Sequence, residues 1–106
     1  RFLVVVVNDG WFGKTSEPYQ HVALSRLRAV EHRMTVLRSA NTGISVHVDE
    51  AGRFTSKLDL DERGVIYAGF SPSVGLTFYG RFGDLFAFLI TLFTFFGGFW
   101  IWHRKR

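Results

Sequence analysis

A short loop near the start of the chain holds the side chains whose types and spacing could form a site. It reads Asn8-Asp9-Gly10-Trp11-Phe12-Gly13 and follows a run of β-branched residues. Open α/β sheets bind ligands at the carboxyl ends of their strands, where this loop lies. Two glycines and two large aromatic side chains suit the wall of a pocket. The spacing alone, however, favours a plain Asp-Gly turn followed by aromatic side chains that plug the domain.

The other reactive residue types do not form a recognisable catalytic pattern. The sequence has no cysteine, which excludes a disulfide, a thiol nucleophile and a thiolate metal site within it. His21 and His32 are not at metal-ligand spacing, so we expect no metal and no cofactor. The acids near the predicted turns are poor candidates for a paired-carboxylate site, because carboxylates in turns are usually solvated. These acids are Asp49, Glu50, Asp59, Asp61 and Glu62.

The most apolar stretch is residues 85–102, LFAFLITLFTFFGGFWIW, which carries no charge. Its length is close to the roughly 20 residues that an α-helix needs to cross a bilayer. We therefore predict a transmembrane helix, followed by a basic cytoplasmic tail at residues 103–106. The alternative is a buried helix of a soluble protein, but such a helix normally has a polar face. Only Thr91 and Thr94 interrupt this one, and we expect their hydroxyls to bond to the helix's own carbonyls.

Composition and charge narrow the class of protein further. The 106 residues are 47% hydrophobic, which is too apolar for a disordered chain. The net charge is +4, and much of it belongs to the terminal tail. The basic residues that remain are scattered, so a nucleic-acid partner is not indicated.

The amino-terminal run Phe2–Val7 predicts a strand. It lacks alternation, which indicates burial on both faces, as in a sheet covered by other layers. The rest of this sequence can cover one face at most. We therefore expect preceding sequence to be missing.

A helix is predicted from about Tyr19 to His32, with Thr15 or Ser16 as its cap and Pro18 in its first turn. Apolar residues recur at helical spacing and predict its buried face. This predicted face consists of Ala23, Leu24, Leu27, Val30 and Met34.

A meander of strands is predicted after the helix. His47 alternates with apolar neighbours on the polar side of its strand, so we expect it to be exposed. Ser71–Ser73 is predicted to be a linker. The predicted strands are Thr35–Arg38, Ile44–Val48, Arg53–Leu60 and Gly64–Phe70, with turns at Ser39–Gly43, Asp49–Gly52 and Asp61–Arg63.

Several motifs, taken together, resemble a known family. The loop Asn8–Gly13 is followed by Gln20-His21, by RLRAVE at residues 26–31 and by LRSANTGIS at residues 37–45. This order resembles the carbon–nitrogen hydrolase (nitrilase) superfamily, and within it the apolipoprotein N-acyltransferase family of bacterial envelopes. GLTFYGR at residues 75–81, followed by a span and a basic tail, resembles that family's return to the membrane.

The resemblance implies an α/β fold, namely the C-terminal part of an αββα sandwich followed by one transmembrane helix. The implied divisions are a partial domain at residues 1–74, a juxtamembrane linker at 75–84, the span at 85–102 and the tail at 103–106. The domain would face the periplasm from the bacterial inner membrane, with the carboxyl terminus in the cytoplasm.

The implied activity is transfer of an acyl chain from a phospholipid donor to an apolipoprotein acceptor. The family uses a glutamate, lysine and cysteine triad, which lies upstream of the segment present here, so no catalytic residue is assigned. The fragment alone is expected to be inactive. By resemblance, Asn8, Asp9, Trp11 and Phe12 form a substrate-pocket loop, and Arg38, Asn41 and Thr42 support it. Ordinary turn, plugging and strand-end roles remain open for these residues.

Two other functions fit the sequence. One is a membrane-tethered amide or nitrile hydrolase of the same superfamily. The other is a non-catalytic, single-pass protein that binds partners, which would require the valine strand to be covered within the chain or by an oligomer.

Overall fold

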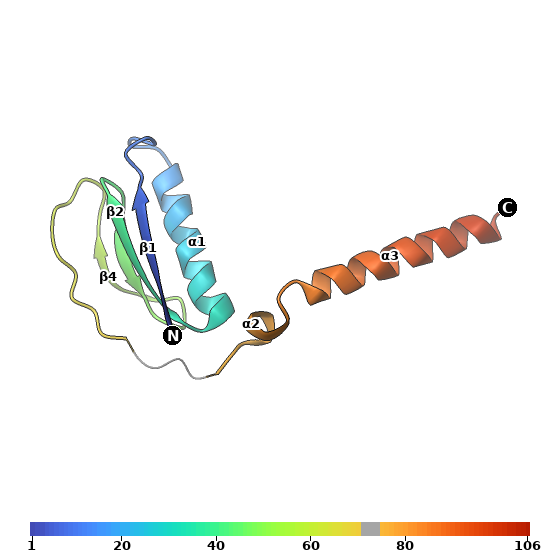
Figure 1. The fold of residues 1–106 in the computed structure, drawn as a ribbon. Coiled ribbons are helices and arrows are strands. Elements are labelled where there is room, and N and C mark those ends of the chain that lie inside the picture. Colours follow the sequence, from blue (N-terminus) through green and yellow to red (C-terminus); the bar gives the residue numbers. More distant parts are fainter. Residues whose placement is uncertain (71–74) are drawn as a thin grey trace.

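The computed structural model describes residues 1–70 and 75–106, and the predicted linker Ser71–Ser73 and the domain boundary at residue 74 lie outside them. The described residues form an α/β domain followed by a projecting helix (Figure 1). The elements in chain order are β1 (Phe2–Asn8), α1 (Glu17–His32), β2 (Thr35–Asn41), β3 (Ser45–Val48), β4 (Phe54–Leu58), α2 (Phe78–Phe82) and α3 (Leu85–Arg104).

The four strands form one sheet in the order β1-β2-β3-β4. β1 and β2 run parallel and are joined through α1, because parallel neighbours need a long crossover. The other two pairs are antiparallel. The parallel register continues to the pair Asn8↔Asn41, so the turn predicted at Ser39–Gly43 was wrong for Ser39–Asn41. Pairing with β1 extends the strand through residues that would favour a turn in isolation.

The strand predicted at Gly64–Phe70 was also wrong. These residues have no regular strand assignment and follow β4 around the outside of the sheet (Figure 1). Val65, Ile66 and Ala68 line a hollow of about 370 Å³ against side chains of the sheet, including Leu37 and Leu58. The segment therefore lies against the sheet without pairing into it.

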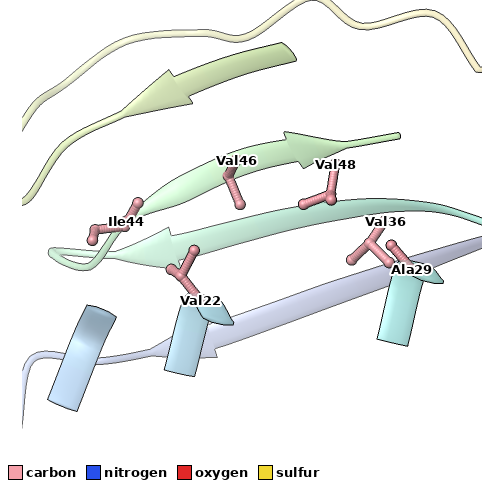
Figure 2. Packing of buried hydrophobic residues seen from close by; sticks show 6 residues of the cluster. All are labelled: Val22, Ala29, Val36, Ile44, Val46 and Val48. Carbon is pink, nitrogen blue, oxygen red and sulfur yellow. The ribbon is translucent and has the colours of Figure 1, made fainter. Parts of the chain in front are cut away.

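The hydrophobic core lies between α1 and one face of the sheet (Figure 2). Full burial of an aliphatic side chain contributes about 1.5–3 kcal/mol relative to exposure, so this small cluster is the main apolar support of the fold. Its members are Val22, Ala29, Val36, Ile44, Val46 and Val48.

The predicted buried face of α1 was wrong. The helix instead buries Val22, Ser25 and Ala29 against the sheet, together with Pro18 in its first turn. These side chains are small, so the helix axis can approach the strands closely. The larger residues are turned outward: Ala23, Leu24, Leu27 and Val30 are exposed, and Met34 is half-buried.

The second face of the sheet is largely open in the described chain. On β1, Val4 is 54% exposed and Val6 is 78% exposed, while Leu3 and Val5 pack against the core. As expected, the described residues cover one face of β1 only, and burial of its second face stays a prediction. The structure thus has one helical layer on one sheet.

His47 was predicted to be exposed, and this was wrong. It lies on the open face beside Leu37 of β2, but only 7% of its surface is accessible. β3 is an inner strand, and neighbouring side chains from both sides shield the ring. Its Nδ1 atom is hydrogen-bonded to Thr55 Oγ1, whereas Nε2 is buried without a hydrogen-bond partner among the described residues.

The apolar C-terminal stretch forms α3, as predicted, and the helix continues two residues further to Arg104. Figure 1 shows it projecting away from the sheet. Among the described residues it is the one helix long and apolar enough to cross a membrane, and none of its residues is buried. The hydroxyls of Thr91 and Thr94 donate to Ala87 O and Ile90 O at 2.8 Å, as expected.

The predicted hairpin turn at Asp49–Gly52 is present, and the Asp49 carboxylate closes it. Oδ1 accepts the backbone N–H groups of Ala51 and Arg53 at 3.0 and 2.8 Å, and Oδ2 pairs with Arg53 Nε at 2.7 Å. Partial burial opposes the charged carboxylate, but these donors outweigh it and lower the pKa of Asp49. The charged form is therefore part of the folded hairpin.

Replacing this carboxylate should weaken the fold at neutral pH. We expect Asp49→Ala to lower the free energy of unfolding by about 1–2 kcal/mol at pH 7. The folded pKa is depressed, so the stabilisation is complete above the unfolded pKa of about 4 and is lost as pH falls through the folded value. Urea unfolding of the full chain in detergent at several pH values measures this. Glu50→Ala is the control, and a deficit that persists unchanged in acid would contradict the assignment.

Candidate functional site

The Asn8–Gly13 loop leaves the carboxyl end of β1 and leads to the start of α1 (Figure 1). Its backbone is folded by its own hydrogen bonds. Gly10 N donates to Asn8 Oδ1 at 3.1 Å, and Phe12 N donates to Asp9 O at 3.1 Å. Thr15 Oγ1 then donates to Phe12 O at 2.9 Å. The loop therefore has a defined shape that begins with an Asx-type turn.

A buried ion pair fastens the loop to the sheet. Arg38 Nη2 on β2 donates to Asp9 Oδ2 at 2.7 Å, and each side chain is 1% exposed. Removing one member of such a pair leaves an uncompensated charge away from water, which typically costs about 3–5 kcal/mol. The ion pair therefore fixes where the loop leaves the strand.

Two residues of α1 complete the cluster around this pair. His21 Nδ1 lies 3.1 Å from Asp9 Oδ1 and 3.1 Å from Arg38 Nη2. Ser25, one turn further along the helix, accepts a hydrogen bond from Arg38 Nη1 at 3.5 Å. The loop, the helix and β2 thus meet at one polar cluster, while Arg38 Nε is buried without a partner among the described residues.

Gly43 leaves the space that the Asp9 carboxylate occupies. A Cβ atom at Gly43 would lie 2.5 Å from Asp9 Oδ2 and 2.9 Å from Ala40 Cβ. Real Cβ contacts are not this short, so any side chain here would displace the carboxylate or the strand. The glycine after Thr42 is therefore required by packing against the loop.

Asn41 and Thr42 lie at the same edge of the sheet. Asn41 is in register with Asn8, and Thr42 has a left-handed backbone conformation with φ of 60°. A Cβ at Gly10 would meet Asn8 Oδ1 at 3.1 Å and Thr42 Oγ1 at 3.3 Å, which shows how closely Thr42 approaches the loop. The structure thus brings Arg38, Asn41 and Thr42 to the loop.

The two aromatic side chains of the loop differ in their surroundings. Trp11 is 89% exposed, while Phe12 is 38% exposed and has an edge contact with the His21 ring at a centroid distance of 6.4 Å. Phe12 therefore covers the cluster, whereas the indole of Trp11 is free to contact another surface.

His21, Ser25 and Gly43 were not predicted as site residues. The helical spacing of His21 and Ser25 places them on one face, but nothing local indicates that this face meets an arginine on a strand. Asp9 and Arg38 are 29 residues apart, so their contact depends on the register of β1 and β2.

The contacts of the cluster are those of a structural support for the loop. Both carboxylate oxygens of Asp9 face protein partners, and the side chain is closed to solvent. No group of three or more His, Cys, Asp or Glu residues suited to a metal occurs among the described residues. The arrangement therefore holds a loop with one free tryptophan at the carboxyl edge of the parallel strands.

Comparison with known proteins gives the class to which this arrangement belongs. The family model described as Carbon-nitrogen hydrolase matches residues 1–77, which include the whole sheet, α1 and the loop. The chain belongs to the carbon–nitrogen hydrolase family.

Curated relatives narrow the similarity. The chain is 41% identical to the apolipoprotein N-acyltransferase of Geobacter metallireducens over 82% of its own length and 17% of the relative. It is 42% identical to the apolipoprotein N-acyltransferase of Rhodopseudomonas palustris, over 79% of this chain and 16% of the relative. It is 43% identical to that of Rickettsia bellii, over 88% of this chain and 19% of the relative. The chain thus spans less than a fifth of the length of these relatives.

The ion pair predicts a large and specific effect on stability. We expect Asp9→Asn to reduce the free energy of unfolding by about 3–5 kcal/mol, because Arg38 stays charged and buried. Asp59→Asn is the matched control, since it breaks the exposed pair with Lys57 and should cost under about 1 kcal/mol.

A double variant separates the ion pair from general disruption. Asp9→Asn with Arg38→Met removes both charges and should recover part of the loss when urea unfolding is followed in detergent. Strictly additive losses would show that the two side chains are not energetically coupled.

Proposed function

We propose that these residues are the C-terminal part of a membrane-bound N-acyltransferase, which moves a phospholipid acyl chain to the α-amine of the N-terminal diacylglyceryl-cysteine of apolipoproteins. The observation that carries this proposal is the reach of the similarity. The alignment with the Geobacter metallireducens enzyme covers 87 residues and the family match covers 77, so at least ten aligned residues lie beyond Thr77. The resemblance thus includes the approach to α3 as well as the domain.

The open face of the sheet supports the view that this chain works within a larger protein. Val4 and Val6 expose apolar surface there, and His47 Nε2 has no partner among the described residues. A second sheet packed on this face would bury the valines and offer the ring a polar group. The αββα sandwich of the family has such a layer.

The proposed reaction needs a thiolate, and this chain has no cysteine. The nucleophile, with its glutamate and lysine, would therefore come from polypeptide outside these residues. The thiolate attacks the ester carbonyl of the phospholipid and expels a lysophospholipid, leaving a thioester. The α-amine of the acceptor then attacks the thioester, forming an amide and releasing the thiolate.

The role proposed for this chain is to form one wall of the acyl-binding site. Asn8 and Asp9 set the course of the loop, Phe12 covers its polar support, and Trp11 offers an exposed ring to the substrate. Arg38, Asn41 and Thr42 hold the loop at the edge of the sheet. Rigid support of a loop limits the error in substrate position, on which the rate of acyl transfer depends.

A chimera tests this function. We expect the Geobacter metallireducens enzyme to retain N-acylation of a diacylglyceryl lipopeptide when its matching C-terminal segment is replaced by this chain. The same enzyme with the segment deleted should be inactive, and so should this chain alone. Mass spectrometry of the lipopeptide measures the added acyl chain.

The chimera also distinguishes the rival activity. A chimera that is inserted in the membrane and as thermally stable as the parent, yet transfers no acyl chain, would contradict the proposal. Release of ammonia from small amides without phospholipid would instead favour a tethered amide hydrolase. In the active chimera, Trp11→Ala should reduce turnover more than Tyr67→Ala, since both rings are highly exposed but only Trp11 is in the loop.

The proposed orientation has the domain in the periplasm of the inner membrane and the tail in the cytoplasm. The absence of cysteine allows single reporters to test this. In cells with a permeabilised outer membrane, an impermeant maleimide should label Glu50→Cys, whereas Lys105→Cys should react only after the inner membrane is opened. The reverse pattern would overturn the orientation.

A further inference from the structure

The short helix α2 is fastened to the end of α1 that lies opposite the Asn8–Gly13 loop (Figure 1). Thr77 caps α2 by accepting the Gly80 N–H at 2.9 Å, and its hydroxyl donates to the Glu31 carbonyl of α1. One threonine thus both starts α2 and ties it to the domain.

Tyr79 connects the domain with the start of α3. Its ring makes an edge contact with His32 at a centroid distance of 5.8 Å, and its hydroxyl donates to Asp84 Oδ1 at 3.2 Å. Asp84 immediately precedes Leu85, the first residue of α3. Contacts with α1 on one side and with the residue before α3 on the other therefore fix the position of α2.

The side of α2 that is not used for these contacts is apolar and exposed. Phe78 is 71% exposed and Phe82 is 46% exposed, and their rings lie 4.8 Å apart between centroids. Leu76, just before the helix, is 47% exposed. Three large apolar side chains thus gather within a few residues of the predicted span.

Two arginines lie on α1 and α2 near these side chains. Arg33 at the end of α1 and Arg81 on α2 are exposed, and neither guanidinium group has an ion-pair or hydrogen-bond partner among the described residues. Of the two nearby acids, Glu31 pairs with Arg28 at 3.0 Å, whereas Asp84 accepts the Tyr79 hydroxyl and has no cationic partner among the described residues. Two cations are thus available to an anionic partner.

We propose that these five residues form a surface that docks onto an anionic phospholipid bilayer. We call it the juxtamembrane surface, and its members are Leu76, Phe78, Phe82, Arg33 and Arg81. The apolar side chains enter the boundary between headgroups and acyl chains, and the guanidinium groups bind lipid phosphates.

Lipid is the expected partner because the juxtamembrane surface is close in sequence to α3. The inference relies on the proposed function insofar as α3 is taken to span the membrane. The juxtamembrane surface then lies only a few residues from the bilayer, so the tether keeps lipid at a high effective concentration. A soluble partner would have to compete with that lipid for the same side chains. Docking of the juxtamembrane surface would fix the distance of the domain from the bilayer, and with it the distance between the Asn8–Gly13 loop and the lipid.

Single-cysteine reporters on the full chain test the surface. An environment-sensitive fluorophore is attached to Phe78→Cys, to Arg63→Cys near the opposite edge of the sheet, or to Phe93→Cys in the middle of α3. The chain is reconstituted into phosphatidylcholine vesicles with or without phosphatidylglycerol, and brominated acyl chains serve as quenchers. We expect quenching at position 93 in both vesicles, strong quenching at 78 only with phosphatidylglycerol, and none at 63.

Charge variants test the arginines. Arg33→Gln and Arg81→Gln, each combined with the label at position 78, should reduce the ratio of docked to undocked domain about fivefold each. Arg63→Gln is the matched control and should leave the ratio unchanged. Added salt should act in the same direction as the two variants.

The outcomes separate this inference from the proposed span. If lipid quenches the label at position 93 while the label at position 78 stays exposed to water in both kinds of vesicle, the proposed juxtamembrane surface is wrong and the proposed span still holds. A label at 78 that is shielded from water but not quenched by lipid shows that protein covers the surface, which also overturns it. An aqueous label at 93 overturns the span on which both proposals rest.

Discussion

One-sided burial of an apolar sheet is the constraint on which this structure depends. A sheet whose strands are apolar on both faces needs two covering layers, and the described residues supply one. α1 closes one face around a small core of valines, an isoleucine and an alanine. The other face leaves Val4 and Val6 exposed and leaves one nitrogen of a buried histidine without a partner. The proposed need for a second layer follows from this imbalance.

The ion pair between Asp9 and Arg38 gives the open sheet its functional edge. Asp9 directly follows β1 and Arg38 lies on β2, so the register of these two strands sets the position of the loop. Gly43 provides the room, and His21 and Ser25 add contacts from the helix. The polar cluster is thus a support, and the exposed indole of Trp11 is the part directed outward.

Local patterns in the sequence predicted the elements better than their partners. The valine run, the helix α1, the Asp49 hairpin and α3 each have a local physical signal, and each is present. The predicted cap of α1 is weaker than expected, because Ser16 makes no side-chain cap hydrogen bond and Thr15 Oγ1 accepts only the Glu17 N–H at 3.4 Å. The signals failed where a neighbour decides the outcome. Residues 39–41 favour a turn alone, yet β1 draws them into β2. The exposed Leu24 and Leu27 are as periodic as a buried face, but the sheet accepts smaller side chains and so selects Val22, Ser25 and Ala29. The motifs at residues 8–13 and 37–45 indicated which residues lie at the loop. The contacts between them could not be predicted, because they depend on the register between β1 and β2.

Accessibility of β1 tests the central proposal, that another layer covers the open face in the longer protein of which we propose this chain is a part. Val6→Cys is placed in this chain alone and in the chimera with the Geobacter metallireducens enzyme, whose own cysteines are recorded as background. The rate of labelling by a water-soluble maleimide is compared with that of Lys14→Cys in the exposed turn before α1. The account predicts that the cysteine at position 6 reacts as fast as that at 14 in the isolated chain and is strongly protected in the chimera. Equal, rapid labelling of position 6 in both proteins would contradict it.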